Sequence, residues 1–359
     1  MDARIQNHAR LLVRYCLDVK KGQTILVRGN SIAEPLFHAI YEELLKVGAY
    51  PALQMAPDGL VPTFFEHAQP HHLSKVPDYL LGLADAADGT INIGSETNTR
   101  SLSHVDPDQQ ATYARNMSVL RKVLIKKPWT ITLFPTQAYA QDAEMPLAAF
   151  EDYAYGAMFA DEDDPVAAWN DLRKQQDTLI KKLKGADKIR ILTDNTDLTL
   201  SVKGRTFINS DGRRNMPSGE IFTGPIENSA NGHVQYDFPV CVHGREVENI
   251  RLVFQDGKVV EATASKNEKF LNTMLDSDPG ARYLGELGIG TNMKIQSFIK
   301  NILFDEKIGG TIHLAVGNSY PETGGTNTST LHWDMIKDLR QGGEIHVDGK
   351  VFQKNGTFV

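Results

Sequence analysis

Residues 330–336, TLHWDMI, place His332 and Asp334 two positions apart within an apolar segment. In an extended strand, residues i and i+2 point to the same face of the sheet. His332 and Asp334 then offer one nitrogen and one oxygen to the same space, a combination that can bind a metal ion. The two residues also fit a structural pair, in which a buried aspartate accepts a hydrogen bond from the histidine.

The second half of the chain contains further polar residues in apolar or glycine-rich surroundings. Glu220 follows Pro-Ser-Gly in the segment NMPSGEIFTGPIE, and Glu286 lies among leucines and glycines in YLGELGIGTN. His313 lies in the apolar strand pattern GTIHLAVG, and Tyr320 and Glu322 belong to the glycine-rich loop that follows it. The glycines beside Glu286 allow a ligand or another stretch of backbone to approach closely.

A structural explanation is available for each of these residues taken singly. Glu220 could pair with Arg213 or Arg214. Glu286 could pair with Arg282, and each histidine could be a hydrogen-bonded core residue. Taken together, two glutamates, two histidines and an aspartate in one half of the chain would need several separate reasons for burying charge. A bound divalent cation accounts for all of them at once.

Two metal stoichiometries fit these residues. The two histidines with Asp334 would form a facial triad that holds one Fe(II) with open positions. Adding Glu220 and Glu286 gives five ligands, which suits two borderline divalent ions such as Zn, Co or Mn. A pair of ions about 3.5–4 Å apart lowers the pKa of a shared water and binds a carbonyl oxygen. The second arrangement therefore predicts a hydrolase.

Composition excludes several other classes of function. A chain of 359 residues with 41% hydrophobic and 23% charged residues is typical of a globular protein of two domains. The net charge of −7 gives no electrostatic basis for binding nucleic acid or an anionic membrane surface. Neither cysteine, Cys16 or Cys241, has zinc-site spacing, and no secretory signal follows Met1, which predicts a cytoplasmic protein. No apolar run approaches the roughly 20 residues of a membrane span.

The first half of the sequence alternates between helical and strand patterns. Helical periodicity in AEPLFHAIYEELLKV ends at Gly48 and is followed by a strand pattern over residues 50–55. Two further strand patterns, DGTINIG and PWTITLF, flank the helical segment DQQATYARNMSVLRKVL. Strands and helices that alternate through short loops predict an open, mainly parallel α/β domain over residues 1–185. No glycine-rich nucleotide-binding motif occurs, so a nucleotide cofactor has no support.

From about residue 187 the pattern changes to short strands joined by tight turns. The segment IRLVFQDGKVVEATA predicts a hairpin with an Asp-Gly turn, and EIHVDGKVFQKNG predicts another. Helical patterns are confined to a few segments, among them residues 267–275 and 297–303. The sequence therefore predicts a β-rich α+β domain over residues 186–359, and this domain carries the candidate metal ligands.

Four segments of this half resemble the aminopeptidase T/aminopeptidase S (PepS) family of dinuclear-metal exopeptidases. They are MPSGEIFTGPIE, LGELGIGTN, EKIGGTIHLAVGNSYPETGG and LHWDMI, and they occur in the family's order. The resemblance covers the C-terminal half well and the N-terminal half loosely. It implies a metal-dependent aminopeptidase with two divalent ions per protomer, a peptide substrate with a free N-terminus, and a homodimer whose active sites open into an enclosed cavity.

The resemblance also assigns roles residue by residue. The metal-binding positions of the family fall on Glu220, Glu286, His313, His332 and Asp334. The catalytic tyrosine falls on Tyr320, which would donate a hydrogen bond to the developing oxyanion. Either Glu220 or Glu286 would take the proton of the water and return it to the leaving amine. Glu306, in the segment DEKIGG, would be a further ligand or would support one.

Two departures from the family pattern leave substrate preference open. The chain is shorter than well-known members, mainly before MPSGE, and GELGIGTN differs from the family's GEVAL-type sequence. A related branch, the 2,5-dihydroxypyridine dioxygenases, shares the scaffold but uses one iron held by two histidines and an aspartate. A mononuclear Fe(II) ring-cleaving dioxygenase is therefore the alternative function.

Overall fold

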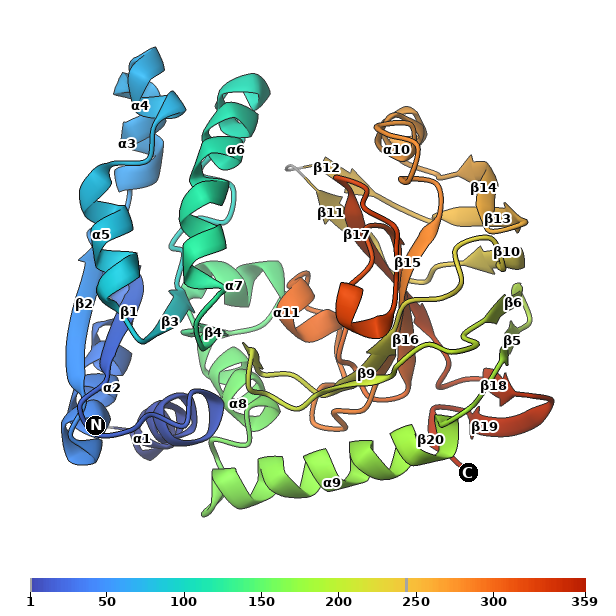
Figure 1. Ribbon diagram of the computed structural model, residues 1–359, viewed down its shortest axis with the longest axis horizontal. Coiled ribbons are helices and arrows are strands. Elements are labelled where there is room, and N and C mark those ends of the chain that lie inside the picture. The colour runs from blue at the N-terminus through green and yellow to red at the C-terminus, as the bar shows by residue number, and fades with distance from the viewer. Residues whose placement is uncertain (1, 243–244) are drawn as a thin grey trace. The chain divides into compact units, whose positions relative to one another are not determined.

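The computed structural model describes residues 2–242 and 245–359, which fall into two compact units (Figure 1). Unit 1 comprises Met1–Trp169 and Gly212–Pro217, and unit 2 comprises Asn170–Asp211 and Ser218–Val359. Within the described ranges, every helix is too short or too polar to cross a membrane.

The units differ from the predicted division at residues 185/186 because of one long helix. The helix α9 (Pro165–Leu183) contributes Leu179 and Leu183 to the hydrophobic core of unit 2. Helical periodicity marks this segment as amphipathic, but the sequence alone does not tell which domain receives its apolar face. The segment Gly212–Pro217 returns to unit 1 because it contains a strand that pairs there.

Unit 1 contains a five-stranded sheet in which every neighbouring pair of strands is parallel. Its strands, in spatial order, are β2 (Tyr50–Ala56), β1 (Thr24–Asn30), β3 (Gly89–Gly94), β4 (Trp129–Leu133) and β8 (Asn215–Met216). Its helices are α1 (Ala3–Arg10), η1 (Leu11–Cys16), η2 (Ser31–Ala33), α2 (Glu34–Val47), α3 (Leu60–His67), α4 (Pro70–Ser74), α5 (Asp78–Ala86), α6 (Pro107–Leu124), α7 (Gln137–Asp142) and α8 (Leu147–Ala157). The predicted parallel α/β architecture is confirmed.

Helix α2 illustrates how the sequence specifies these elements. A proline occupies its first turn, where the missing N–H has no partner to lose. Leu36, Ile40 and Leu44 recur at helical spacing and are all buried. The helix ends at Gly48, whose φ of 78° is left-handed and is adopted readily only by glycine.

A buried histidine, His8 on α1, makes the stability of unit 1 depend on pH. Its Nε2 lies 2.7 Å from Thr132 Oγ1, and the Thr132 hydroxyl donates to the Met216 carbonyl at 2.7 Å. The hydroxyl therefore accepts from Nε2–H, and His8 Nδ1 has no hydrogen-bond partner among the described residues. Burial lowers the pKa of His8 to about 3, so the ring is neutral in the folded protein at pH 7.

We expect the folded state to lose stability through His8 as the pH falls below about 6.5, the pKa of an unfolded histidine. Below that pH the unfolded chain binds a proton that the folded chain does not, which costs about 2 kcal/mol at pH 5. The test compares unfolding free energies of the parent and His8→Gln, which keeps an N–H donor but cannot titrate. Between pH 7 and 5 the parent should lose about 2 kcal/mol more than the variant; parallel profiles would contradict the assignment.

Unit 2 is built mainly from antiparallel strands. An eight-stranded sheet contains, in order, β14 (Lys258–Thr263), β13 (Arg251–Gln255), β10 (Asn231–Gln235), β6 (Thr196–Ser201), β5 (Lys188–Thr193), β18 (Glu344–Val347), β19 (Lys350–Lys354) and β20 (Thr357–Phe358). A five-stranded sheet contains β17 (His332–Asp338), β16 (Thr311–Gly317), β15 (Leu284–Gly290), β9 (Glu220–Thr223) and β7 (Ile208–Ser210). The other elements are β11 (Val240–Val242), β12 (Arg245–Val247), α10 (Glu268–Leu275), α11 (Ile302–Asp305) and η3 (Pro321–Thr323). The predicted β-rich α+β architecture is confirmed.

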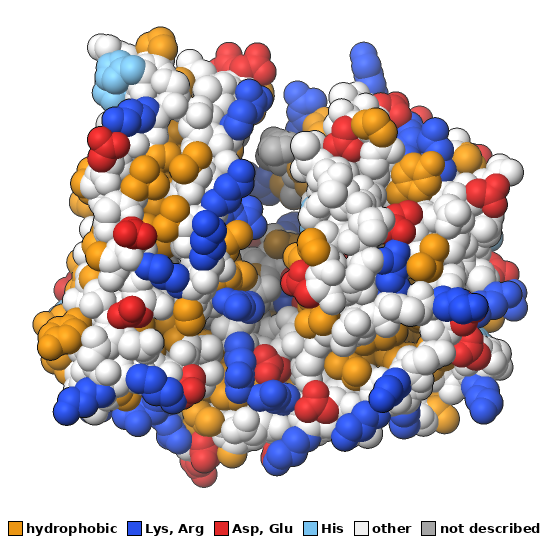
Figure 2. Space-filling view, viewed as in Figure 1, with side chains coloured by type: hydrophobic (Ala, Val, Ile, Leu, Met, Phe, Trp, Pro, Cys, Tyr) orange, Lys and Arg blue, Asp and Glu red, His pale blue; other side chains and the backbone are white. Residues whose placement is uncertain are grey.

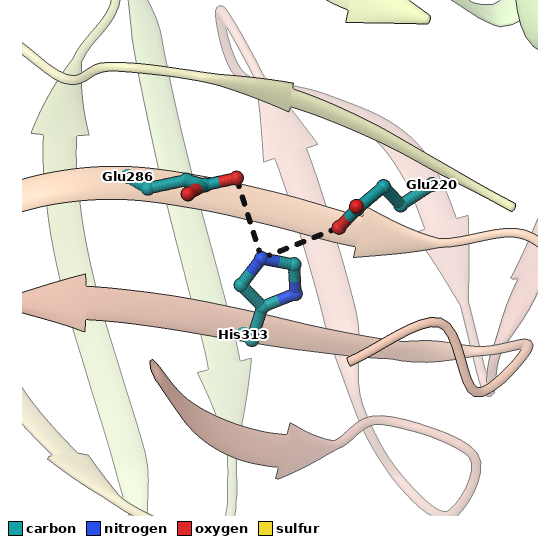
Figure 3. Close-up of side chains that lie close together, drawn as sticks. All are labelled: Glu220, Glu286 and His313. Carbon is teal, nitrogen blue, oxygen red and sulfur yellow. Dashed lines mark hydrogen bonds and ion pairs between the residues drawn. The ribbon is translucent and has the colours of Figure 1, made fainter. Parts of the chain in front are cut away.

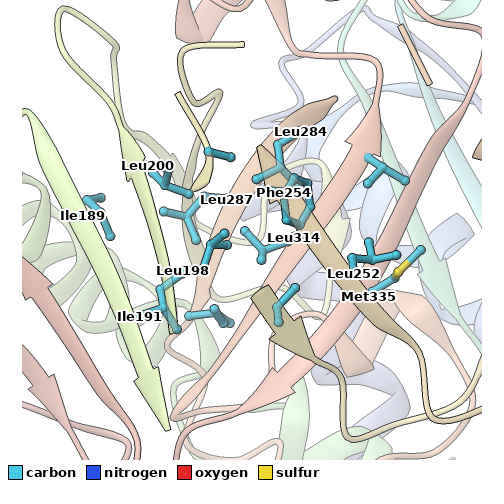
Figure 4. Close-up of a cluster of buried hydrophobic side chains, with 14 of the residues drawn as sticks. Ile189, Ile191, Leu198, Leu200, Leu252, Phe254, Leu284, Leu287, Leu314 and Met335 are labelled. Carbon is cyan, nitrogen blue, oxygen red and sulfur yellow. The ribbon is translucent and has the colours of Figure 1, made fainter. Parts of the chain in front are cut away.

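The main core of unit 2 joins one face of each of its two large sheets (Figure 4). Leu198 and Leu200 of β6 belong to the same buried cluster as Leu287 of β15, Leu314 of β16 and Met335 of β17. All seven residues of β15 and of β16 are buried, so both faces of these strands are covered. Because side chains alternate along a strand, the neighbours of these core residues point to the opposite face of the five-stranded sheet.

Candidate metal centre

The opposite face of the five-stranded sheet brings together all five predicted ligands. They come from four adjacent strands: Glu220 from β9, Glu286 from β15, His313 from β16, and His332 and Asp334 from β17. In the register of the sheet, both Glu286 and Asp334 pair with the same residue of β16, Ala315. Residues paired in this way present their side chains on one face.

These side chains form three overlapping groups in which the possible ligand atoms all lie within 4.8 Å of one another. The groups are Glu220, Glu286 and His313; Glu286, His332 and Asp334; and Glu306, His313 and Asp334. The first two groups share Glu286 and together contain every predicted ligand. Because they share Glu286, the two groups can hold two neighbouring ions with one carboxylate in common.

The spacing of the ligand atoms suits metal binding better than direct hydrogen bonding. His313 Nε2 lies 3.4 Å from Glu220 Oε2 and 3.5 Å from Glu286 Oε1 (Figure 3). His332 Nε2 lies 3.4 Å from Glu286 Oε2 and 3.5 Å from Asp334 Oδ2. These separations are long for hydrogen bonds. They match the roughly 3.4 Å expected between ligand atoms that surround an ion tetrahedrally at about 2.1 Å.

Two carboxylate oxygens in the cluster have no hydrogen-bond partner among the described residues. They are Glu220 Oε2 and Asp334 Oδ1, and both are buried. A buried oxygen with negative charge is costly unless a cation or a donor satisfies it. The residues present therefore fit divalent ions, with nitrogen and oxygen donors of the kind that Zn, Co and Mn accept.

Backbone carbonyls orient both histidines toward the cluster. His313 Nδ1 lies 3.1 Å from the Glu306 carbonyl oxygen, and His332 Nδ1 lies 2.9 Å from the Asn318 carbonyl oxygen. A carbonyl can only accept, so each Nδ1 carries the hydrogen and each Nε2 is left as the ligand atom. This is the supporting contact that metal-binding histidines usually make.

Gly288 makes room for the ring of His313. The two residues are paired across β15 and β16, and a Cβ at position 288 would overlap the imidazole. The glycines in GELGIGTN therefore allow the close approach predicted from the sequence, and the group that approaches is a ligand side chain. Any side chain at this position would displace His313 from the cluster.

The mutual charges of the cluster shift several pKa values. Burial opposes ionisation of Glu286, but the neighbouring imidazoles of His313 and His332, when protonated, outweigh it and lower the Glu286 pKa to about 2. Burial also opposes the charged form of His332, yet Glu286 and Asp334 raise its pKa to about 9. Burial raises the pKa of Glu220. Metal binding would replace the protons of the histidines, since a ligand nitrogen must be unprotonated.

Gln176 of α9 supports the main chain at Glu220 and was not anticipated from the sequence. This side chain is fully buried, and its Nε2 donates to the Glu220 carbonyl oxygen at 3.0 Å. The same nitrogen lies 3.0 Å from Thr291 Oγ1, just beyond the end of β15. Gln176 thereby ties β9 to β15 beside the cluster. A lone glutamine in a helical pattern gives no signal of this role.

The arginines that the sequence offered as partners for the two glutamates contact other residues, and a lysine lies beside the cluster instead. Arg282 pairs with Asp276 at 2.6 Å rather than with Glu286. The Nζ of Lys307 lies 3.6 Å from Glu220 Oε1 and makes an ion pair with Glu306. The side chain of Lys307 is fully buried. Its only sequence signal is its place in DEKIGG, where a lysine beside a glutamate also suits an exposed turn.

Arg213 and Arg214, which the sequence offered as partners for Glu220, stack on aromatic rings of unit 1. The guanidinium of Arg213 lies over Tyr15, and that of Arg214 lies over Trp129. Cation–π contacts of this kind stabilise a positive charge without a carboxylate.

Tyr320 lies at the rim of the cluster. Its ring centroid is 5.3 Å from that of His332 and 5.4 Å from that of Phe222, and both pairs are edge-to-face. The N–H and hydroxyl of Thr323 both donate to the Tyr320 carbonyl, which fixes the turn at η3. The residue is 38% exposed, so it is accessible to a ligand in the site. Burial, with the carboxylates of the cluster, raises the Tyr320 pKa, so its hydroxyl keeps its proton.

Comparisons with known proteins cover nearly the whole chain. A family model described as "Thermophilic metalloprotease (M29)" matches residues 1–358. The chain is 26% identical to Aminopeptidase 2 of Geobacillus stearothermophilus, over 97% of this chain and 94% of that protein. It is 27% identical to Aminopeptidase PepS of Streptococcus thermophilus, over 99% and 98%. It is also 27% identical to Aminopeptidase T of Thermus aquaticus, over 100% and 98%.

A solved structure has the same fold. Wild-type AmpT from Thermus thermophilus superposes with a TM-score of 0.87, covering 99% of both chains at 22% sequence identity. The Thermus thermophilus protein therefore shares the fold described above.

Proposed function

The chain belongs to the thermophilic metalloprotease (M29) family, and from this premise we propose that it is a metal-dependent aminopeptidase acting through two divalent ions. The relatives named above are all aminopeptidases, and the comparisons give the alternative of a ring-cleaving dioxygenase no support. The observation that carries the dinuclear proposal is the overlap of two ligand groups at Glu286.

The two overlapping groups suggest which residues hold each ion. Glu220, Glu286 and His313 would hold one, and Glu286, His332 and Asp334 would hold the other. The nitrogen and oxygen donors suit Zn, Co or Mn. When bound, such a pair of ions supplies an activated water and polarises the scissile carbonyl.

Glu220 and Glu286 are both candidate ligands, but their surroundings shift their pKa values in opposite directions. Glu286 is held ionised by both histidines and belongs to both groups, which suits a bridging ligand. Burial raises the pKa of Glu220, so this carboxyl binds a proton more readily than Glu286, whose pKa is lowered. We therefore assign proton transfer from the water to the leaving amine to Glu220.

Tyr320 is proposed to stabilise the oxyanion. Its ring packs edge-to-face on His332, which belongs to one of the two ligand groups. A protonated hydroxyl beside that group is a preorganised donor for charge that develops on the carbonyl oxygen. Because Tyr320 is partly exposed, a substrate can approach it from solvent.

The assembly and location of the enzyme follow as further proposals. The edge strand β2 of unit 1 exposes Tyr50, Leu53 and Met55, and Figure 2 shows hydrophobic side chains on the surface of this unit. An unpaired edge with apolar side chains favours association with a second copy, which supports the proposed homodimer.

The presence of only two cysteines in 359 residues supports a reducing, cytoplasmic location.

A pair of substrates that differ only at the amino group tests the aminopeptidase assignment. The metal-loaded protein should hydrolyse leucyl p-nitroanilide and act on its N-acetyl derivative at least about 100-fold more slowly, because a site built for a free amine rejects the blocked one. Release of p-nitroaniline reports both rates. Equal rates on the two substrates would be incompatible with an exopeptidase that binds the N-terminus.

A further inference from the structure

The side chain of Lys307 reaches the candidate metal centre. It is the second residue after the end of α11, and its side chain is fully buried. Its Nζ lies 3.6 Å from Glu220 Oε1 and makes an ion pair with Glu306 Oε1. Each of these glutamates belongs to one of the ligand groups. The lysine therefore contacts the cluster through carboxylates that are candidates to face the ions.

We propose that Lys307 is a positioning residue whose ammonium serves as an internal counter-charge, holding the carboxylates together before divalent ions bind. The inference rests on the proposed metal centre, but it concerns a residue that is not itself a ligand. Lysine has no acceptor and cannot coordinate a cation while charged. Its contribution must act through Glu220 and Glu306.

The charges of the cluster explain why such a residue is useful. The three ligand groups contain four carboxylates, from Glu220, Glu286, Glu306 and Asp334. Like charges this close repel, and each loses hydration on burial. A buried ammonium in contact with two of them offsets part of that penalty whenever the ions are absent. The site can then fold first and take up metal afterwards.

The same charge must oppose the ions once they arrive. An ammonium close to Glu220 repels a divalent ion bound by that carboxylate, since like charges interact strongly where little water screens them. Replacing Lys307 by an uncharged residue should therefore destabilise the metal-free fold and strengthen metal binding. The stability that the metal-free fold loses should reappear as stronger metal binding, because folding and metal binding are thermodynamically linked.

Lys307→Met removes the ammonium while retaining much of the side-chain volume. Protein purified with Zn is divided and measured after chelation and after Zn saturation. Breaking a buried ion pair is strongly destabilising, so we expect the chelated variant to melt at least about 5 °C below the chelated parent. The Zn-saturated proteins should melt within about 2 °C of one another. The Zn dissociation constant, from competition with a chromophoric chelator, should fall at least about tenfold.

Lys337→Met is the matched control. Lys337 is also a buried lysine of unit 2, 3% exposed and paired with Asp237 at 3.0 Å. It lies on β17 three residues beyond Asp334, so its side chain points to the other face of the sheet. This variant should lower the melting temperature equally with and without Zn and leave the dissociation constant unchanged.

A second variant separates charge from packing. Glu306→Gln combined with Lys307→Met removes both charges of the ion pair, so the chelated double variant should melt above the chelated single variant. It also provides a test if Lys307→Met alone yields no folded protein. A double variant no more stable than the single one would indicate a packing role and overturn the inference.

The metal measurements separate the inference from the function on which it rests. If the parent binds Zn but Lys307→Met binds it equally or more weakly, the counter-charge role is wrong and the metal centre stands. Equal losses of melting temperature with and without Zn would also contradict the counter-charge role. A parent that binds no divalent ion would overturn both the proposed function and this inference.

Discussion

Changing Asp334 to Asn is expected to remove most metal binding and nearly all activity. Asn has the same shape but no negative charge, so the fold should change little. Asp334 belongs to two of the three ligand groups, and its Oδ1 is buried without a hydrogen-bond partner among the described residues. Losing a group that merely supports a ligand weakens metal affinity about 10- to 100-fold. Losing this ligand should exceed that range, with activity only partly restored by excess Zn, Co or Mn.

Asp338→Asn provides the control for this experiment. Asp338 lies at the end of the same strand and pairs with Arg340 at 2.6 Å, outside the three ligand groups. Its replacement should leave the metal dissociation constant unchanged. Metal affinity is measured by competition with a chelator, and turnover is measured at several metal concentrations. If Asp334→Asn kept the parent's metal content and turnover, His332 and Asp334 would be a structural pair only.

Changing Tyr320 to Phe is expected to separate catalysis from metal binding. The substitution keeps the ring that packs on His332 and Phe222 and removes only the hydroxyl. Loss of one preorganised oxyanion donor lowers turnover by about 10²–10³-fold. Because that hydrogen bond forms mainly in the transition state, kcat and kcat/KM should fall together while KM changes little.

Steady-state kinetics on a free aminoacyl anilide, with metal content measured in parallel, provide the test. Tyr79→Phe, which changes a tyrosine 70% exposed on α5, is the control and should match the parent. Turnover of Tyr320→Phe within about threefold of the parent, far from the expected loss, would remove the hydroxyl from the mechanism. A loss of bound metal in the variant would instead indicate that Tyr320 supports the ligands.

The composition of the site could be predicted because each candidate ligand contradicts its local surroundings. Glu286 and His313 occur in strands whose other residues are apolar or small, and a charged group in such a strand needs a partner. The i, i+2 relation of His332 and Asp334 also follows from strand geometry alone. Both features depend only on residues that are neighbours in the chain, so the sequence alone reveals them.

The register that brings the strands together could not be predicted. Between Leu284 and Glu286 the pairing of β15 with β16 shifts by one residue. The shift lets Leu284 join the core while Glu286 faces the ligands, although the two residues are two positions apart. Gly285, between them, approaches backbone oxygens so closely that a Cβ would overlap them. Irregularities of this kind re-aim side chains near active sites, and nothing in the local pattern marks where they fall.

Lys307 and Gln176 were missed for a related reason. Each is a polar residue with a plausible exposed position in its local pattern, and each becomes buried only through contacts with distant strands. Lys307 reaches Glu220, and Gln176 supports the carbonyl of the same residue. Long-range contacts also place Leu179 and Leu183 of α9 in the core of unit 2. The sequence predicted the candidate ligands, whereas the residues that position them emerged from the fold.

The number of metal ions per protomer tests the dinuclear account most directly. Protein stripped with a chelator and dialysed against excess Zn, Co or Mn is washed, and its metal content is measured by mass spectrometry against protein concentration. Because Glu286 joins two ligand groups, the account predicts a saturating ratio of two ions per protomer. A saturating ratio of one, with iron preferred over Zn, Co and Mn, would contradict it.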